Sequence, residues 1–298
     1  MDLSLVIPIY NEQESLRSGL PSWIDFTAAR GWTLILVNDG SRDQTRDILA
    51  NLPFYEHVHV IHHKVNRGYG GALKTGLTAA MTEYSITFDA DGQHHLESID
   101  NLVAAQQNSD ADLVIGARVN ADRNAFTRGV GKKIIRWISR ILIPNQISDL
   151  NSGMKLYKTS LVKKYLPLCP DSMAFSDVIT LSFLANRHLV VETPIEILPR
   201  TTGKSTINFN TAVDTVIEII NIVMMFYPLR IFLPLAAILL AAGLIWGLPI
   251  VLMGRGVSVG AMLALISGGL CLLLGLIAEQ LSQIRRDLLR KDDKDAAR

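Results

Sequence analysis

Two long runs without a charged side chain constrain this chain more than any other feature. They extend over residues 231–253 and 257–278. Each is longer than the roughly 20 apolar residues that a helix needs to cross a bilayer, and the core helix of a soluble protein rarely runs so far without a charge. Only Gly254, Arg255 and Gly256 separate the runs. We therefore expect an antiparallel helical hairpin in a lipid bilayer.

Basic residues around the hairpin predict its orientation. Arg230 precedes the first run, and Arg255 stands alone in the turn. A basic cluster follows the second run: Arg285, Arg286, Arg290 and Lys291. By the positive-inside rule both ends of the hairpin face the cytoplasm. We expect a multi-pass protein of the cell (inner) membrane, without a signal peptide, whose N-terminal domain is cytoplasmic.

Composition narrows the classes of partner. The 298 residues carry a formal net charge of +1. The overall charge of the chain therefore does not attract nucleic acid, and we expect no nucleic-acid partner. Hydrophobic residues make up 49% of the chain, and the excess lies in its last quarter. Cys169 and Cys271 are expected to be unpaired thiols.

The first two hundred residues alternate between strand and helix patterns. Apolar runs typical of buried strands occupy residues 3–10, 33–37, 58–61, 83–88 and 113–117. Helical spacing follows at 14–23, from about residue 43 with Ser41 as N-cap, at 72–81 and at 161–166. Residues 189–195 indicate an edge strand, because a central strand would not accept Pro194. This alternation predicts an α/β domain with a mostly parallel sheet between helices.

Asp89 and Asp91 follow the fourth apolar run, immediately before Gly92. Alternate side chains of an extended segment share a face, so both carboxylates can contact one object. Neighbouring carboxylates repel each other unless a cation lies between them, and a divalent ion that also holds a phosphate fits. The alternative is a solvated Asp-rich turn. Other polar clusters also follow predicted strands, and ligands of such sheets bind at the carboxyl ends of the strands.

Two further segments are expected at the membrane surface. Residues 118–140 contain seven arginines and lysines against one acid, interleaved with apolar residues. This pattern favours contact with anionic headgroups or a phosphate over a solvated helix face. Residues 209–227 form a mostly apolar helix pattern that we expect to lie in the interface and lead to the hairpin at Pro228.

Six motifs in order resemble one family: VIPIYNE, VNDGS, NRGYGGALKTG, FDADGQ, SDLNSGMKLY and PRTTGKS. They are similar to glycosyltransferase family 2, inverting enzymes of the GT-A (Rossmann-like) fold. Within it they resemble the polyprenyl-phosphate group, which includes dolichyl-phosphate mannose synthase-like and bacterial polyprenyl-phosphate glucosyltransferase-like enzymes. The resemblance extends over residues 3–210, and the paired apolar helices also match one branch of that group. Together with the apolar and charged runs, it leads us to expect a catalytic domain at 1–208, an interfacial helix at 209–229, a transmembrane hairpin at 230–280 and a charged cytoplasmic tail at 281–298.

The resemblance also implies roles for individual residues. The nucleotide-sugar site would be formed by Pro8, Tyr10, Glu12, Asp39, Arg67 and Gly68, with Tyr10 packed on the base and Asp39 accepting a ring N–H. Asp89 and Asp91 would hold Mg²⁺ or Mn²⁺ and the diphosphate, with Gln93 beside them facing the acceptor. The lipid phosphate would be held by Arg118 and Arg128. A basic loop closing over the site would contain Arg200 and Lys204.

The implied reaction moves one sugar from a nucleotide-sugar, UDP-glucose or GDP-mannose, to a polyprenyl phosphate. A phosphate acceptor is largely ionised at pH 7, since its second pKa is near 6, so it needs no general base. Asp177 stands where other members carry such a base, and we do not expect that role here. The alternatives are a GT-A transferase acting on a glycan or protein hydroxyl and a non-catalytic scaffold. Gly268, Gly269 and Gly275 offer the hairpin a surface for a second copy.

Overall fold

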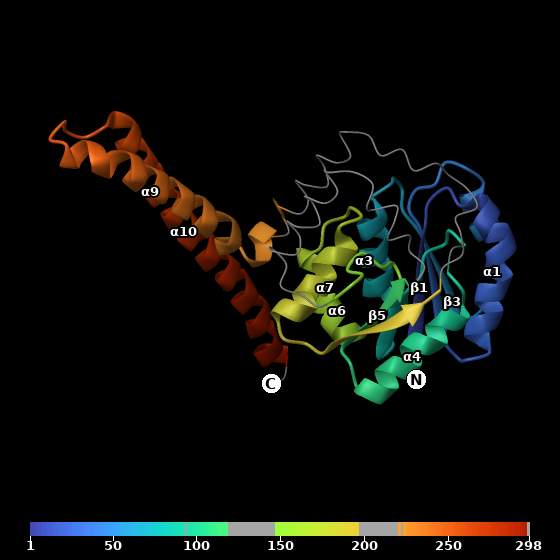
Figure 1. Ribbon diagram of the computed structural model, residues 1–298. Helices are drawn as coiled ribbons and strands as arrows, with labels where there is room; N and C mark the ends of the chain where they lie inside the picture. Colours follow the sequence, from blue (N-terminus) through green and yellow to red (C-terminus); the bar gives the residue numbers. More distant parts are fainter. Residues whose placement is uncertain (93, 119–146, 197–219, 222, 297–298) are drawn as a thin grey trace. The chain divides into compact units, whose positions relative to one another are not determined.

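A computed structural model describes residues 1–92, 94–118, 147–196, 220–221 and 223–296. The chain divides into two compact units. The described part of the first unit consists of residues 1–92, 94–118 and 147–196, and that of the second lies within 220–296. Figure 1 shows a sheet with helices around it in the first unit and two long helices in the second.

The first unit is built on a seven-stranded sheet in the order β3-β2-β1-β4-β6-β5-β7. The strands are β1 (Leu3–Ile9), β2 (Thr33–Asn38), β3 (Val58–His62), β4 (Tyr84–Thr87), β5 (Leu113–Arg118), β6 (Lys155–Lys158) and β7 (Val190–Ile195). Every pairing is parallel except those of β6, which runs antiparallel to β4 and β5. The expected mostly parallel α/β sheet is confirmed, and β7 is an edge strand as Pro194 indicated.

Helices cover both faces of this sheet. They are α1 (Gln13–Ala28), α2 (Thr45–Ala50), α3 (Tyr69–Ala79), α4 (Glu97–Ser109), α6 (Thr159–Tyr165), the 3₁₀ turn η1 (Leu166–Leu168) and α7 (Phe175–Ala185). Alternation along β1 sends Leu5 and Ile7 into the core cluster that includes Trp23 of α1, whereas Val6 faces Gly76 of α3. The sheet is therefore buried on both faces, as its continuous apolar strands require.

Three local predictions were wrong or incomplete. Ser41 is not an N-cap, because α2 begins at Thr45 and the Ser41 hydroxyl accepts the Asn11 amide at 3.0 Å. Strand β6, which begins at Lys155, and helix α7, whose first turn is 175–177, were not predicted. Helix α4, between the carboxylate pair and β5, was not predicted.

The second unit contains a helical hairpin of α9 (Leu229–Leu252) and α10 (Val259–Ala296), which run side by side in Figure 1. Both helices are long and apolar enough to cross a membrane. Helix α10 continues to Ala296, through most of the charged tail predicted at 281–298. The predicted interfacial helix lies mostly outside the described residues.

Glycines bring the two helices of the hairpin together. A Cβ at Gly268 would lie 2.8 Å from Leu240 of α9, and one at Gly275 would lie 2.6 Å from Phe232. These two glycines therefore pack within the hairpin, where the sequence suggested contact with a second copy. Gly269 has no neighbour within 4 Å and faces away from α9.

Candidate active site

A cavity of about 210 Å³ opens at the carboxyl ends of β4 and β5. Its walls come from the start of α3, the segment after β4, the loop before β6 and the start of α7. Nine of the described residues line it: Tyr69, Asp89, Asp91, His94, Arg118, Asn151, Gly153, Met173 and Ser176. The cavity thus places the carboxylate pair opposite one of the predicted phosphate-binding arginines.

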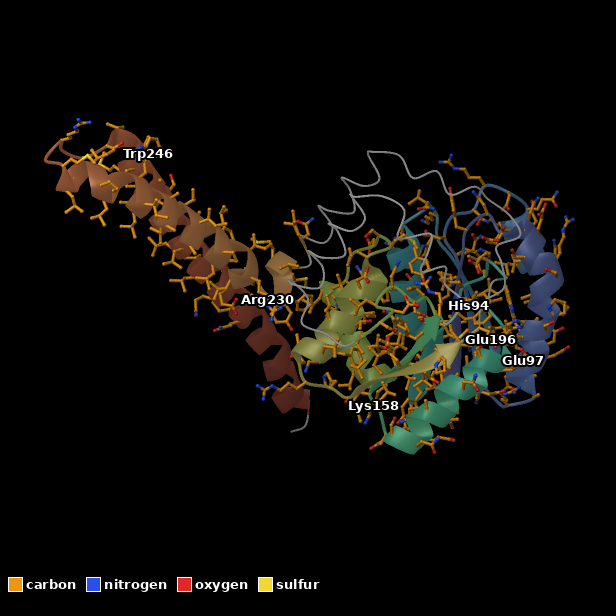
Figure 2. The ribbon with its side chains drawn as sticks, in the orientation of Figure 1. His94, Glu97, Lys158, Glu196, Arg230 and Trp246 are labelled. Carbon is orange, nitrogen blue, oxygen red and sulfur yellow. The ribbon has the colours of Figure 1, made fainter. Side chains whose placement is uncertain are left out.

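Asp89 is held from three sides. The Tyr69 hydroxyl donates to its Oδ1 at 2.8 Å, and Nε2 of His94, labelled in Figure 2, lies 3.8 Å from its Oδ2. Gly153 packs against the carboxylate so closely that a Cβ there would lie 2.6 Å from the Asp89 Cγ. About a quarter (26%) of the Asp89 side chain remains exposed, so the carboxylate is fixed and still reachable from the cavity.

Burial sets the electrostatics around this carboxylate. It raises the pKa of Asp89 above its ordinary value, and the like charge of Asp91 adds to the increase. The Tyr69 hydroxyl, His94 and Arg118 act in the opposite direction. Burial also lowers the pKa of His94, which favours a neutral imidazole at pH 7. A cation bound between the two acids would relieve the repulsion between their carboxylates.

Arg118, at the end of β5, is fixed by a fork to Asp149. Its Nε and Nη2 each donate to an Asp149 oxygen at 2.7 Å. The Asp149 amide in turn donates to Glu192 Oε1 at 3.0 Å. The hydrogen bond from Arg118 to Asp149 raises the pKa of the guanidinium. Arg118 is therefore a pre-positioned cation, as bidentate guanidinium pairs generally are.

Asp39 lies at the end of β2 and is 2% exposed. Its Oδ1 accepts from His63 Nδ1 at 2.6 Å and from the Arg67 amide at 2.9 Å, and its Oδ2 accepts the Gly68 amide at 2.8 Å. The carboxylate thus orders the loop before α3, and its contact with a nucleobase stays a prediction. Because Tyr69 follows Gly68, Asp39 also fixes the residue that holds Asp89.

The loops after β1 and β2 are tied together beside Asp39. Asn11 adopts a left-handed backbone conformation (φ 54°), and its Oδ1 accepts the Arg42 amide at 2.8 Å. Tyr10 is 41% exposed, which excludes a core role for its ring. Pro8 and Glu12 flank it and are partly buried. An exposed aromatic ring on a braced loop suits stacking on a planar ligand.

The glycine-rich start of α3 is a packing surface. Gly68 has φ +90°, and a Cβ at Gly70 would lie 2.8 Å from the Ser172 carbonyl. The Gly71 amide donates to the Asp171 carbonyl at 3.3 Å, and Lys74 Nζ contacts the Asp171 carboxylate at 2.6 Å. The glycines therefore admit the backbone segment 170–172, which leads into α7 and the cavity wall.

Sequence reasoning located part of this site. Asp89, Asp91 and Arg118 share the cavity, whereas the predicted nucleotide residues lie at the ends of β1 and β2 and in the loop before α3. Four predicted residues lie outside the described part of the chain: Gln93, Arg128, Arg200 and Lys204. The lining residues that were not predicted as site residues are Tyr69, His94, Asn151, Gly153, Met173 and Ser176. The SDLNSGMKLY motif could have indicated Asn151 and Gly153.

The donor atoms suit a hard divalent cation. Carboxylate oxygens of Asp89 and Asp91 are the ligand type that Mg²⁺ and Mn²⁺ prefer. Within the described residues no three His, Cys, Asp or Glu side chains converge on one point. Mg²⁺ is commonly held by one or two carboxylates together with substrate phosphates, and the two aspartates are ligands of that kind.

The chain belongs to glycosyl transferase family 2, whose model matches residues 4–166, and it is a glycosyltransferase. A second model, the GtrB C-terminal hairpin, matches residues 227–284. The chain is 28% identical over 270 residues to an undecaprenyl-phosphate 4-deoxy-4-formamido-L-arabinose transferase of Pectobacterium carotovorum, covering 87% of this chain and 78% of the relative. It is 27% identical to the Klebsiella pneumoniae transferase of that name, over 96% of this chain and 90% of the relative.

Solved structures agree on the fold. Glucosyl-3-phosphoglycerate synthase of Mycobacterium tuberculosis superimposes with a TM-score of 0.57 at 16% identity, covering 74% of this chain and 79% of that one. Crystals of that enzyme hold UDP-glucose with Mn²⁺ in one case and UDP with Mg²⁺ in another. Such structural neighbours establish the GT-A fold for this chain, and they show that this fold accommodates a divalent metal beside a nucleotide.

Proposed function

We propose that this protein transfers one sugar, with inversion, from a nucleotide-sugar to a polyprenyl phosphate at the cytoplasmic face of the membrane. UDP-glucose is the leading donor and GDP-mannose the second. The observation that carries the proposal is the cavity in which Asp89 and Asp91 face Arg118. Relatives named as undecaprenyl-phosphate transferases match across both the catalytic domain and the hairpin, which supports the same acceptor.

The cavity is suited to joining two anions. Arg118 would hold the acceptor phosphate, with Arg128 as its predicted partner, while Asp89 and Asp91 face the donor diphosphate. The phosphate oxygen already carries charge at pH 7, so attack on the anomeric carbon requires no proton removal. Asp177 is not among the described residues that line the cavity, and we assign it no general-base role. The residues then act by positioning and by balancing charge.

Mg²⁺ or Mn²⁺, held by Asp89 and Asp91, would stabilise the negative charge of the departing diphosphate. The Tyr69 hydroxyl and Gly153 keep the Asp89 carboxylate in one orientation. Tyr10 is free to stack on the base, and Asp39 orders the loop beside it. Each of these side chains performs binding or orientation, and none has to move a proton.

The hairpin supports a reaction at a membrane. Two helices of sufficient length, with Arg230 in the first turn of α9 and basic residues toward the end of α10, support a protein with both ends of the hairpin on the cytoplasmic side. A polyprenyl phosphate keeps its chain in the bilayer and its headgroup at the surface, so an enzyme fixed to that surface meets the acceptor at high local concentration.

The test is transfer of label from nucleotide-sugars to lipid. The full-length protein in nanodiscs is incubated with undecaprenyl phosphate, Mg²⁺ or Mn²⁺ and radiolabelled UDP-glucose, GDP-mannose or other nucleotide-sugars in turn. We expect one donor to deliver label to the organic phase. Excess chelator and Asp89→Asn should each abolish delivery, whereas Asp47→Asn, an exposed carboxylate on α2, should leave it unchanged.

Three outcomes would contradict the proposal. Label that enters a glycan or protein but no lipid would indicate a hydroxyl acceptor. Pathway function that survives Asp89→Asn would indicate a scaffold. Full transfer in excess chelator would remove the metal from the mechanism.

A further inference from the structure

Lys155 is a lysine of β6 that is 0% exposed. Its Nζ donates to the Leu150 carbonyl and to the Ser176 carbonyl, each at 2.6 Å. Both bonds are at the short end of the range, as expected when the donor is charged. A buried ammonium is costly unless such bonds compensate it, so its presence beneath a cavity calls for a functional reason.

The two carbonyls belong to two separate segments that contribute residues to the active-site cavity. Leu150 lies between Asp149, which holds Arg118, and Asn151, which lines the cavity. Ser176 lines the cavity from α7, and its hydroxyl bonds to the Tyr69 oxygen. One ammonium therefore ties together the loop that orients Arg118 and the helix start that supports Tyr69.

Through these two segments, Lys155 is connected to residues on the metal side and on the acceptor side of the cavity. Tyr69 donates to the Asp89 carboxylate on the metal side. Arg118 is fixed by Asp149 on the acceptor side. The elements that carry these residues are distant in sequence, since α3 precedes β6 by more than seventy residues and α7 follows it by about twenty. Lys155 links the walls through backbone carbonyls, which cannot rotate away as side chains can.

The charges around Lys155 come from several elements. Burial lowers its pKa to about 8. The carboxylates of Asp177 on α7 and Asp149 in the loop before β6 oppose this decrease, and Arg118 on β5 adds to it. The nearby Cys169 thiol has a pKa raised to about 12 by burial, so it is neutral through the working range. Lys155 is therefore cationic at pH 7 and loses its charge just above it.

We propose that Lys155 is a positioning residue for sugar transfer. Its ammonium holds the loop at 149–153 and the first turn of α7 in place, so that Arg118 faces the acceptor phosphate while Asp89 faces the donor diphosphate. This inference rests on the proposed function for its kinetic test. Lys155 contacts neither reactant, and it acts through Leu150 and Ser176.

The test replaces Lys155 with Met, which fills a similar volume without charge or donor. The matched control is Lys158→Met on the same strand, where the exposed lysine is labelled in Figure 2. We expect Lys155→Met to lower kcat about 100-fold, the loss typical of a reacting group displaced by 1 Å, and to change the donor KM less than threefold. If the lysine only fills space, both variants will keep the wild-type kcat, and the proposal fails.

The pH profile separates positioning from packing. Wild-type kcat should fall as the pH rises through about 8, where Lys155 loses its charge. Lys155→Met should lack this basic limb, and so should Lys155→Gln, which keeps two N–H donors without the charge. A basic limb that persists unchanged in either variant would overturn the proposal.

Hydrogen exchange tests Lys155 without relying on turnover. In the full-length protein, Lys155→Met should speed amide exchange in peptides covering 149–153 and 175–178, and Lys158→Met should not. If neither Lys155 variant folds, the wild-type pH profile is the test, and a kcat that does not fall as the pH rises through about 8 overturns the proposal. If Lys155→Met leaves exchange in these peptides unchanged, the proposal is overturned. If exchange changes as expected but the wild type transfers no sugar to lipid, only the proposed function is overturned.

Discussion

Gly153→Ala is a small change with a large expected effect on Asp89. A Cβ at residue 153 would lie 2.6 Å from the Asp89 Cγ and 2.9 Å from its Oδ1. Carbon atoms in contact are normally about 3.5–4.0 Å apart, so the carboxylate must retreat by about 1 Å. The φ angle of Gly153 lies outside the positive region, so alanine causes no backbone strain of its own. The substitution therefore perturbs Asp89 selectively.

The expected loss follows from that displacement. A reacting group misplaced by 1 Å costs about 100-fold in rate, which corresponds to about 2.7 kcal/mol of transition-state free energy. The shift also strains the 2.8 Å hydrogen bond from Tyr69 to Asp89. We expect Gly153→Ala to lower kcat by about this factor and to raise the Mg²⁺ concentration at half-maximal rate.

The assay is transfer of radiolabelled sugar to undecaprenyl phosphate across a Mg²⁺ titration, with melting temperature as the check on folding. Gly269→Ala is the matched control, since a Cβ there meets no atom within 4 Å. If Gly153→Ala folds normally and keeps the wild-type rate and metal dependence, the inferred role of this glycine in fixing Asp89 is refuted.

Three further predictions concern stability and acceptor binding. The fold lowers the pKa of Lys155 from 10.5 to about 8, so between these pH values the unfolded chain binds more protons than the folded one. The free energy of unfolding should therefore rise with pH over this range, by up to roughly 3 kcal/mol. If the melting temperatures of wild type and Lys155→Met change in parallel over this range, the prediction is wrong. Gly70→Ala places a Cβ 2.8 Å from the Ser172 carbonyl and should destabilise the domain by about 1–3 kcal/mol, measured by thermal unfolding. Arg118→Lys loses the fork to Asp149 and should lower kcat/KM for the lipid phosphate at least about tenfold, and an unchanged value would remove Arg118 from acceptor binding.

Two of the strands that were predicted correctly show the same pattern. Residues 33–37 and 113–117 are continuous apolar runs, which only a doubly covered sheet buries along their whole length. Strand β6 escaped prediction because it begins with Lys155 and ends with Lys158. A lysine normally indicates exposure, and only the carbonyls of Leu150 and Ser176, supplied by distant segments, make its burial tolerable.

The site residues likewise divide into those that local sequence predicted and those that depend on distant contacts. Asp89 and Asp91 were predicted because their spacing and their place after a strand are local properties. Tyr69 and Gly153 were missed because their importance lies in contacts with Asp89 across 20 or more residues of sequence. Asp39 was predicted as a base contact, and the fold shows its carboxylate engaged with His63 and two backbone amides.

The sequence by itself determined the α/β sheet, the paired acids and the apolar hairpin, because periodicity, turn residues and the length of an apolar run act over a few neighbouring residues. Only the tertiary structure decided which side chains support those acids, how Arg118 is held, and that Gly268 and Gly275 pack within the hairpin. Such contacts join segments far apart in the chain. Their geometry depends on the whole packed fold, and no local pattern encodes it.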